Sequence, residues 1–155
     1  MVAIVFARAQ VPIHPDFSGT WIMDTVQSEK SSFNPAGMLY RISQTGTSIV
    51  IDRASTSATG AVTSTHMVLG TDGKPWKNAL KLVGQEVEAA STVAWRGDTL
   101  VIRTTSTPGE KTLLQVDEWM LSADGNTLRM HRQATYDGAP IGAPMWVFGR
   151  AVAVR

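Results

Sequence analysis

The chain consists of short stretches in which side-chain polarity alternates, separated by glycine-containing turn signals. In the clearest stretch, residues 85–96, one alternating set is apolar or small and the other is mostly charged or polar. Gly97-Asp98 follows at once, and these are residue types of a two-residue hairpin loop. Because successive side chains of a strand point to opposite faces, a period of two predicts β-strands rather than helices.

The whole chain contains nine or ten such segments, with little helix. A short helical turn is expected near 28–32. The spacing of the segments favours an antiparallel up-and-down meander. Since a flat sheet of this size would expose long edges, we expect an all-β meander barrel of about eight to ten strands, with a two-sheet sandwich as the alternative. Strands are expected at 17–23, 38–45, 48–54, 61–69, 76–83, 85–96, 99–106, 111–121, 127–135 and 145–154.

Composition excludes several classes of protein. Lys and Arg number 14 and Asp and Glu 13, so the net charge of +1 argues against a nucleic-acid binder. With 43% hydrophobic and 17% charged residues, the chain is not intrinsically disordered. It has no cysteine, which excludes disulfides, a thiol nucleophile and a thiolate metal site.

The first residues pair an apolar run with Ala7-Arg8-Ala9, a pattern like the end of a secretory signal. We assign 1–12 to an N-terminal arm or signal-peptide remnant, with an ordinary first strand as the alternative, and 13–155 to a single barrel domain. The pattern predicts a periplasmic or secreted protein. No stretch reaches the roughly 18 apolar residues of a membrane span. Charges at the expected outward positions favour a water-soluble barrel over a membrane barrel.

Gly19-Thr20-Trp21 stands directly before the meander and resembles the G-x-W signature of lipocalins and related calycin barrels. The resemblance implies that Trp21 lies at the closed end of a barrel. It also implies that an arginine of the last strand, here Arg150, packs across the indole ring. The chain has no long helix before its last strand, and 24–37 is short for the helix pair of fatty-acid-binding barrels. It therefore resembles a bacterial variant with neither feature.

The alternation also predicts which side chains line the interior. Most are apolar or aromatic, but eight scattered polar groups fall among them, which indicates a wet cavity for a small molecule rather than a dry core. The last strand is apolar on both faces, so the alternation does not show which of its faces points inward. The expected ligand-binding residues are Ser64, Trp76, Asn78, Ser91, Trp95, Thr104, Gln115, Trp119 and Arg132.

His66 and Asp117 are the candidate catalytic residues of this predicted interior. A carboxylate beside an imidazole fixes its tautomer and raises its basicity, as acid–base catalysis requires. Ser64 or Ser91 could complete a triad, although no G-x-S-x-G elbow is present. A β-bulge that exchanged Asp117 with Glu118 would remove the pair.

The histidines His14, His66 and His131 have no metal-binding spacing, which leaves haem ligation by one of the last two as an alternative. We expect no metal and no cofactor. The predicted function is binding of one small, mostly apolar ligand, a hydrophobic or amphipathic molecule. The alternatives are a cofactor-independent isomerase, cyclase or hydrolase and an interaction module with a filled core. No nucleic-acid partner and no membrane span are expected, and the oligomeric state stays open.

Overall fold

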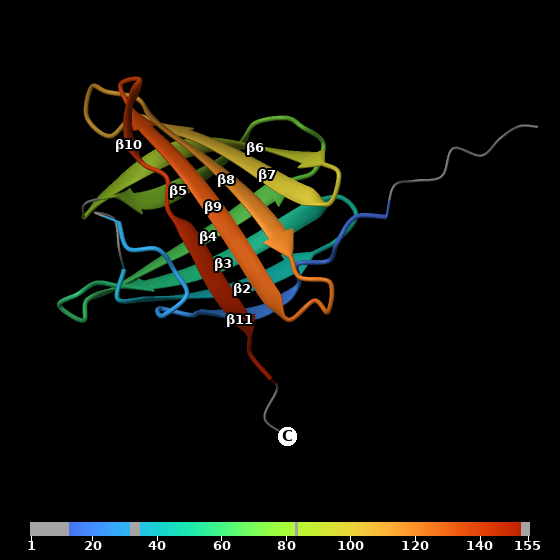
Figure 1. Ribbon diagram of the computed structural model, residues 1–155. Helices are drawn as coiled ribbons and strands as arrows, with labels where there is room; N and C mark the ends of the chain where they lie inside the picture. Colours follow the sequence, from blue (N-terminus) through green and yellow to red (C-terminus); the bar gives the residue numbers. More distant parts are fainter. Residues whose placement is uncertain (1–12, 32–34, 83, 153–155) are drawn as a thin grey trace, which may run out of the picture.

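The computed structural model describes residues 13–31, 35–82 and 84–152, which form one antiparallel sheet curled into a barrel (Figure 1). The predicted arm at 1–12 lies outside the described residues. In the described parts the strands are β1 (Gly19–Met23), β2 (Gly37–Gln44), β3 (Ser48–Thr56), β4 (Val62–Gly70), β5 (Trp76–Leu82), β6 (Gln85–Arg96), β7 (Thr99–Ser106), β8 (Leu113–Leu121), β9 (Thr127–Tyr136), β10 (Ala139–Gly142) and β11 (Met145–Arg150).

The strands follow an up-and-down order, which confirms the predicted meander. Along the sheet the order is β4-β3-β2-β1-β11-β9-β8-β7-β6-β5, and β10 pairs with β9 alone. The first and last strands are therefore neighbours, with Trp21 opposite Arg150. Only β10 was not expected, because it lies in the Gly- and Pro-rich segment 136–144. No helix long and apolar enough to cross a bilayer occurs among the described residues.

The helical turn expected near 28–32 does not form in 28–31, the part of this range that the structure describes. A single turn forms earlier, where the Ser28 amide donates to the Asp24 carbonyl oxygen at 3.0 Å. The Asp24 carboxylate also accepts from the amides of Val26 and Gln27. Ser28 then binds the backbone of β11, donating to the Val147 carbonyl and accepting from its amide at 2.9 Å. This side-chain pairing with β11 replaces a continued helix.

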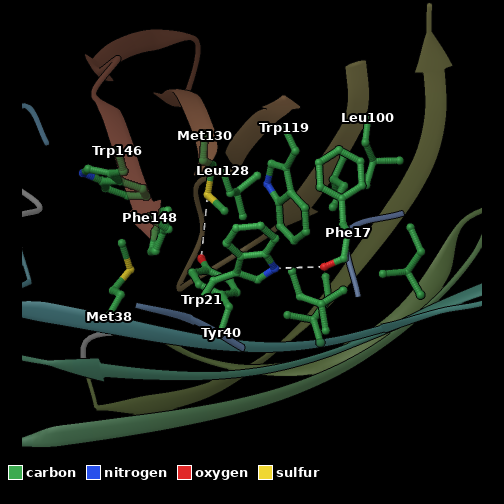
Figure 2. Packing of buried hydrophobic residues seen from close by; sticks show 14 of the residues in the cluster. Phe17, Trp21, Met38, Tyr40, Leu100, Trp119, Leu128, Met130, Trp146 and Phe148 are labelled. Atoms are coloured by element: carbon green, nitrogen blue, oxygen red, sulfur yellow. Dashed lines mark hydrogen bonds between the residues drawn. The ribbon is translucent and has the colours of Figure 1, made fainter. Parts of the chain in front are cut away.

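One end of the barrel is filled by an aromatic plug, formed by Phe17, Trp21, Tyr40, Trp119 and Phe148 (Figure 2). All five side chains are buried. Edge-to-face contacts join the rings of Phe17, Trp119, Tyr40 and Phe148 in series, with Tyr40 lying 5.9 Å from Trp119 and 5.3 Å from Phe148 between ring centroids. Such contacts add about 0.5–1.5 kcal/mol each to the burial of the rings.

Trp21 and Arg150 make the contact that the resemblance implied. The guanidinium carbon of Arg150 lies 4.3 Å from the centre of the Trp21 ring. The guanidinium also donates to the carbonyl oxygens of Ser18 at 2.6 Å and Gly125 at 2.9 Å, so it is held from both sides. The Trp21 indole donates to the Phe17 carbonyl at 2.9 Å. These bonds fix the plug at this end.

Gly19 is required by both its conformation and its surroundings, and its replacement tests this end of the barrel. Its φ is +139°, and an added Cβ would lie 2.5 Å from Nη1 of Arg150. We expect Gly19→Ala to lower the free energy of unfolding by about 2 kcal/mol, measured by urea denaturation. Gly46→Ala is the control, since a Cβ there meets nothing within 4 Å. Equal stability of the two variants would contradict this role.

The barrel is closed between β4 and β5 by side chains of β5 rather than by a backbone ladder. The Asn78 side-chain amide accepts from the Val68 amide at 2.8 Å and donates to the Val68 carbonyl at 3.0 Å. Trp76 covers Gly70 so closely that a Cβ on Gly70 would overlap its ring. The Trp76 indole donates to Asp72 at 3.1 Å, and this hydrogen bond, with that of the Lys74 amide, holds the pKa of Asp72 below its ordinary value. We call this junction the β4–β5 seam.

Asn78→Ala should loosen the seam. Two hydrogen bonds to the Val68 backbone are lost, each worth about 1 kcal/mol net. We therefore expect a fall of roughly 1–2 kcal/mol in the free energy of unfolding and faster hydrogen exchange at the Val68 amide. Lys77→Ala removes only an exposed ion pair to Glu88 and serves as the control. Unchanged protection of the Val68 amide in Asn78→Ala would show that other contacts close the barrel.

Candidate functional site

The other end of the barrel is hollow. A cavity of about 440 Å³ lies above the aromatic plug, within the usual size range of small-molecule sites. Pro35, Lys81, Pro108, Tyr136 and Ile141 line its outer part, which we call the mouth. The apolar wall deeper inside comes from strands all round the barrel: Met38, Met67, Leu80, Leu82, Ile102, Leu113, Trp119, Ala134 and Trp146.

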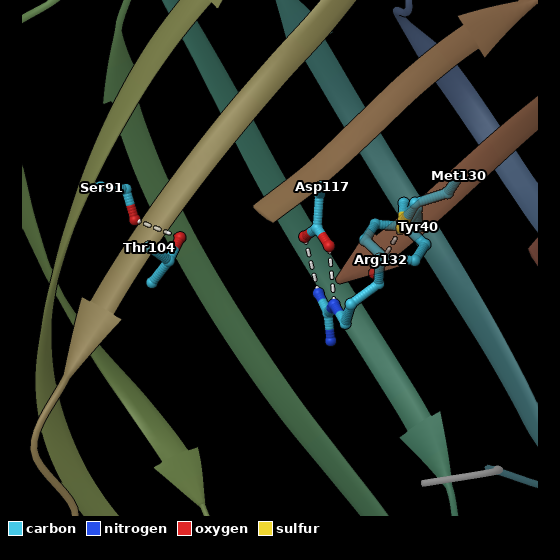
Figure 3. A network of polar contacts seen from close by, with 6 residues as sticks. All are labelled: Tyr40, Ser91, Thr104, Asp117, Met130 and Arg132. Carbon is cyan, nitrogen blue, oxygen red and sulfur yellow. Dashed lines mark hydrogen bonds and ion pairs between the residues drawn. The ribbon is translucent and has the colours of Figure 1, made fainter. Parts of the chain in front are cut away.

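An ion pair between Asp117 and Arg132 forms the polar part of the β8–β9 wall (Figure 3). The two residues are direct partners across the strands. The guanidinium donates from Nε to Oδ1 and from Nη2 to Oδ2, both at 2.7 Å, in a bidentate arrangement. It also lies 5.1 Å from the centre of the Trp146 ring. Burial alone would lower the pKa of Arg132, but the charge and hydrogen bonds of Asp117 outweigh it and raise that pKa.

Arg53 forms a second polar region, on β3. It lies in a row with Tyr40 of β2 and Thr65 of β4. Its Nη2 donates to Thr65 Oγ1 at 3.2 Å, while its Nε is buried with no partner among the described residues. No carboxylate of the described chain forms an ion pair with Arg53. In the barrel order β3 and β8 are five strands apart, so the two polar regions lie on opposite walls.

Other polar groups near the cavity differ in whether they have a hydrogen-bond partner. The hydroxyls of Ser91 and Thr104 bond each other at 2.7 Å (Figure 3). Among the described residues, the hydrogen-bond partner of the Tyr40 hydroxyl is the Met130 sulfur, at 3.8 Å. The indole nitrogens of Trp119 and Trp146 are buried with no partner among the described residues.

No protein family and no curated protein sequence matches the chain. Among solved structures, it is similar to zebrafish ileal bile acid-binding protein, determined as a complex with cholic acid. The TM-score is 0.50 at 16% sequence identity, and the match covers 88% of this chain and 98% of that chain. The fold is a calycin-type barrel. This likeness, together with the Trp21–Arg150 contact, confirms the predicted fold and carries no information about activity.

Several residues predicted to face the interior of the calycin barrel do line its cavity. Thr104, Gln115, Trp119 and Arg132 do so, and Asp117 lies beside them. On their strands, β7 to β9, the set of residues chosen from the sequence is the inward set. A bulge that would exchange Asp117 with Glu118 is absent, because the β8–β9 register runs without interruption from Leu113 to Leu121.

The predicted orientation of β4 is wrong, and with it the inward placement of Ser64 and His66. Thr65, Met67 and Leu69 point inward instead. His66 lies outside, with 61% of its side chain exposed, and its Nδ1 is 2.6 Å from Oδ1 of Asp52. Asp117 meanwhile binds Arg132. The predicted His66–Asp117 pair is therefore not formed, and neither is a triad built on it.

Four further predicted ligand-binding residues lie away from the cavity. Trp76 and Asn78 close the β4–β5 seam, as described above. Ser91 is buried against Thr104 and does not reach the cavity. Trp95 lies at the plugged end, where His14 stacks on it at 4.1 Å between ring centroids. These side chains build the barrel and its ends rather than its binding surface.

The predicted lining lacked residues of β2, β3 and β11, which the structure places at the cavity. Tyr40 stands between Met38 and Ile42 in its alternating set, and Arg53 follows Ile49 and Ile51 in its own. The same period of two would therefore have placed both inside. For Trp146 no such signal exists, since its neighbours Val147 and Phe148 are also buried. Val147 is covered from outside by Ser28, which the sequence alone does not reveal.

Among the described residues, no group of three or more His, Asp or Glu side chains could hold a metal ion. His66 and Asp52 form a pair without a third member, and both are more than half exposed. The charged groups that the described cavity wall brings together are those of the Asp117–Arg132 ion pair. This wall holds no acid–base pair of the kind predicted from the sequence.

The Asp117–Arg132 pair can be tested by a double-mutant cycle. Asp117→Leu or Arg132→Met alone leaves a buried charge unpaired and should cost roughly 3–5 kcal/mol of unfolding free energy. The double variant should cost much less than the sum of the two. The control pair Arg96–Glu118 is more exposed, and breaking it should cost less than about 1 kcal/mol. Additive losses in urea denaturation would contradict the coupling.

Proposed function

We propose that this protein binds one small, mostly apolar molecule in its barrel cavity. The observation that carries the proposal is the hollow of about 440 Å³ above the aromatic plug. A domain stabilised only by packing would fill this space, because voids in a core cost stability and are rare. An apolar cavity with a few polar groups is instead the common form of a ligand site.

The lining supports a ligand with more apolar than polar surface. Removing apolar surface from water contributes roughly 25 cal/mol per Å², before the costs of ordering the ligand. Met38 and Met67 have flexible, polarizable side chains that adapt to different shapes.

The structural neighbour supports the same class of ligand. Zebrafish ileal bile acid-binding protein was solved with cholic acid, a small amphipathic molecule. The present chain shares its barrel fold at 16% identity. Because sites differ among proteins with one fold, this likeness supports the use of the cavity and leaves the identity of the ligand to the lining residues.

Binding can be tested with 1-aminoanthracene, a neutral apolar fluorophore. Its fluorescence should rise on binding with a stoichiometry of one per chain. Ala134 is buried and lines the cavity, so Ala134→Phe should fill part of that space and weaken binding by at least about tenfold. Ala94→Phe places the same ring on the exposed face of β6 and should bind as the wild type does.

Two outcomes would contradict the proposal. In one, the wild-type protein binds neither 1-aminoanthracene nor any of three simple apolar or amphipathic molecules, decanoate, decan-1-ol and cholate. In the other, Ala134→Phe and Ala94→Phe affect binding equally, which would place the fluorophore on the surface. Thermal unfolding of both variants shows whether each is folded, so a loss of binding is not confused with a loss of structure.

A further inference from the structure

Charge is unevenly distributed around the cavity. Its lining contains the cations Arg53, Lys81 and Arg132 and one carboxylate, Asp117. Asp117 is held bidentately by Arg132, so these two neutralise each other. Lys81 is exposed at the mouth, where water solvates it. Arg53 remains as the half-buried cation of the described cavity wall that has no carboxylate partner.

We propose that the ligand carries an anionic head group and that Arg53 binds it. The proposal rests on the proposed function, since it names the class of ligand that the same cavity takes. Arg53 is half-buried, so its guanidinium has lost part of its hydration, and a carboxylate or sulfonate of the ligand would supply an ion pair in exchange. The molecule would thus be an anionic amphipath.

The geometry around Arg53 fits this role. One nitrogen, Nη2, is used by Thr65, and Nε is buried without a partner. No hydrogen bond from Nη1 is found among the described residues. Ser55, two residues further along the same face of β3, also lines the cavity, and its hydroxyl can donate a second hydrogen bond. Together they provide a charged and a neutral donor on one wall.

Arg132 is less suited to the same task, although it also lines the cavity. Both oxygens of Asp117 accept from it, and an anion that approached this pair would meet the Asp117 carboxylate as well. The head group is therefore placed on β3. The apolar part of the ligand then extends toward Ile102, Leu113 and Ala134 on the opposite wall.

A pair of ligands that differ only in the head group tests this inference. Decanoate and decan-1-ol share one chain length, and each can be measured by displacement of 1-aminoanthracene at pH 7.5. We expect the wild-type protein to bind decanoate at least about tenfold more tightly than decan-1-ol. In Arg53→Met, decanoate should lose this advantage while decan-1-ol binds about as before.

Matched variants separate charge from shape. Arg53→Lys keeps the positive charge and should retain part of the preference for decanoate. Arg103→Met removes an exposed arginine from the outer face of β7 and should leave the preference unchanged. Cholate serves as a second anion. If cholate displaces the fluorophore more strongly than decanoate does, the result supports an anionic ligand with a rigid steroid frame. The reverse order supports an anionic ligand with an acyl chain.

The outcomes distinguish this inference from the proposed function. Equal binding of decanoate and decan-1-ol to the wild type would overturn the anionic head group and leave ligand binding intact. A preference for decanoate that survives in Arg53→Met would overturn the assignment to Arg53. If neither ligand nor the fluorophore binds, the proposed function fails together with the inference drawn from it.

Discussion

The contact between Trp21 and Arg150 determines where this barrel is filled and where it is hollow. Arg150 is held by two backbone carbonyls, and Trp21 by a third, so the first and last strands meet at a fixed register. The plug aromatics pack on this contact and occupy one end of the interior. With that end filled, the remaining space lies toward the mouth.

The walls of the cavity keep polar groups that a purely structural core would not need. Burying Asp117 and Arg132 removes two charges from water, a cost that their mutual attraction offsets only through close bidentate geometry. Arg53 forms no ion pair with a carboxylate of the described residues, and the indole nitrogens of Trp119 and Trp146 have no hydrogen-bond partner there. A domain with a completely packed core would be more stable with aliphatic side chains at these positions, because burying polar groups costs free energy. The half-buried Arg53 at the cavity wall is understandable if an anionic group of the ligand supplies its partner.

Strand positions, meander order and the Trp21–Arg150 contact could be predicted because each depends on local alternation or on a short motif. The inward face of β7, β8 and β9 followed from the same alternation. Alternation gave the wrong inward face for β4, because both faces of this strand carry apolar residues: Val62 and Val68 on one, Met67 and Leu69 on the other. The pairing with the neighbouring strand decides which face points inward. The partner of His66 could not be foreseen either, since Asp52 reaches it only through the β3–β4 register. Trp76 and Asn78 are predicted from the sequence to bind the ligand, but they close the β4–β5 seam instead, which depends on the two end strands of the sheet meeting when it curls.

The tryptophan indoles give the most direct test of a ligand cavity above the plug. In a ¹H–¹⁵N correlation spectrum each of the five indole N–H groups gives its own signal. On addition of decanoate, the signals of Trp119 and Trp146, which line the cavity, should shift. Those of Trp21 and Trp76, bonded to Phe17 and Asp72, should stay nearly constant. Shifts confined to Trp76 or Trp95, with Trp119 and Trp146 unmoved, would place the ligand outside the cavity and contradict the proposed site.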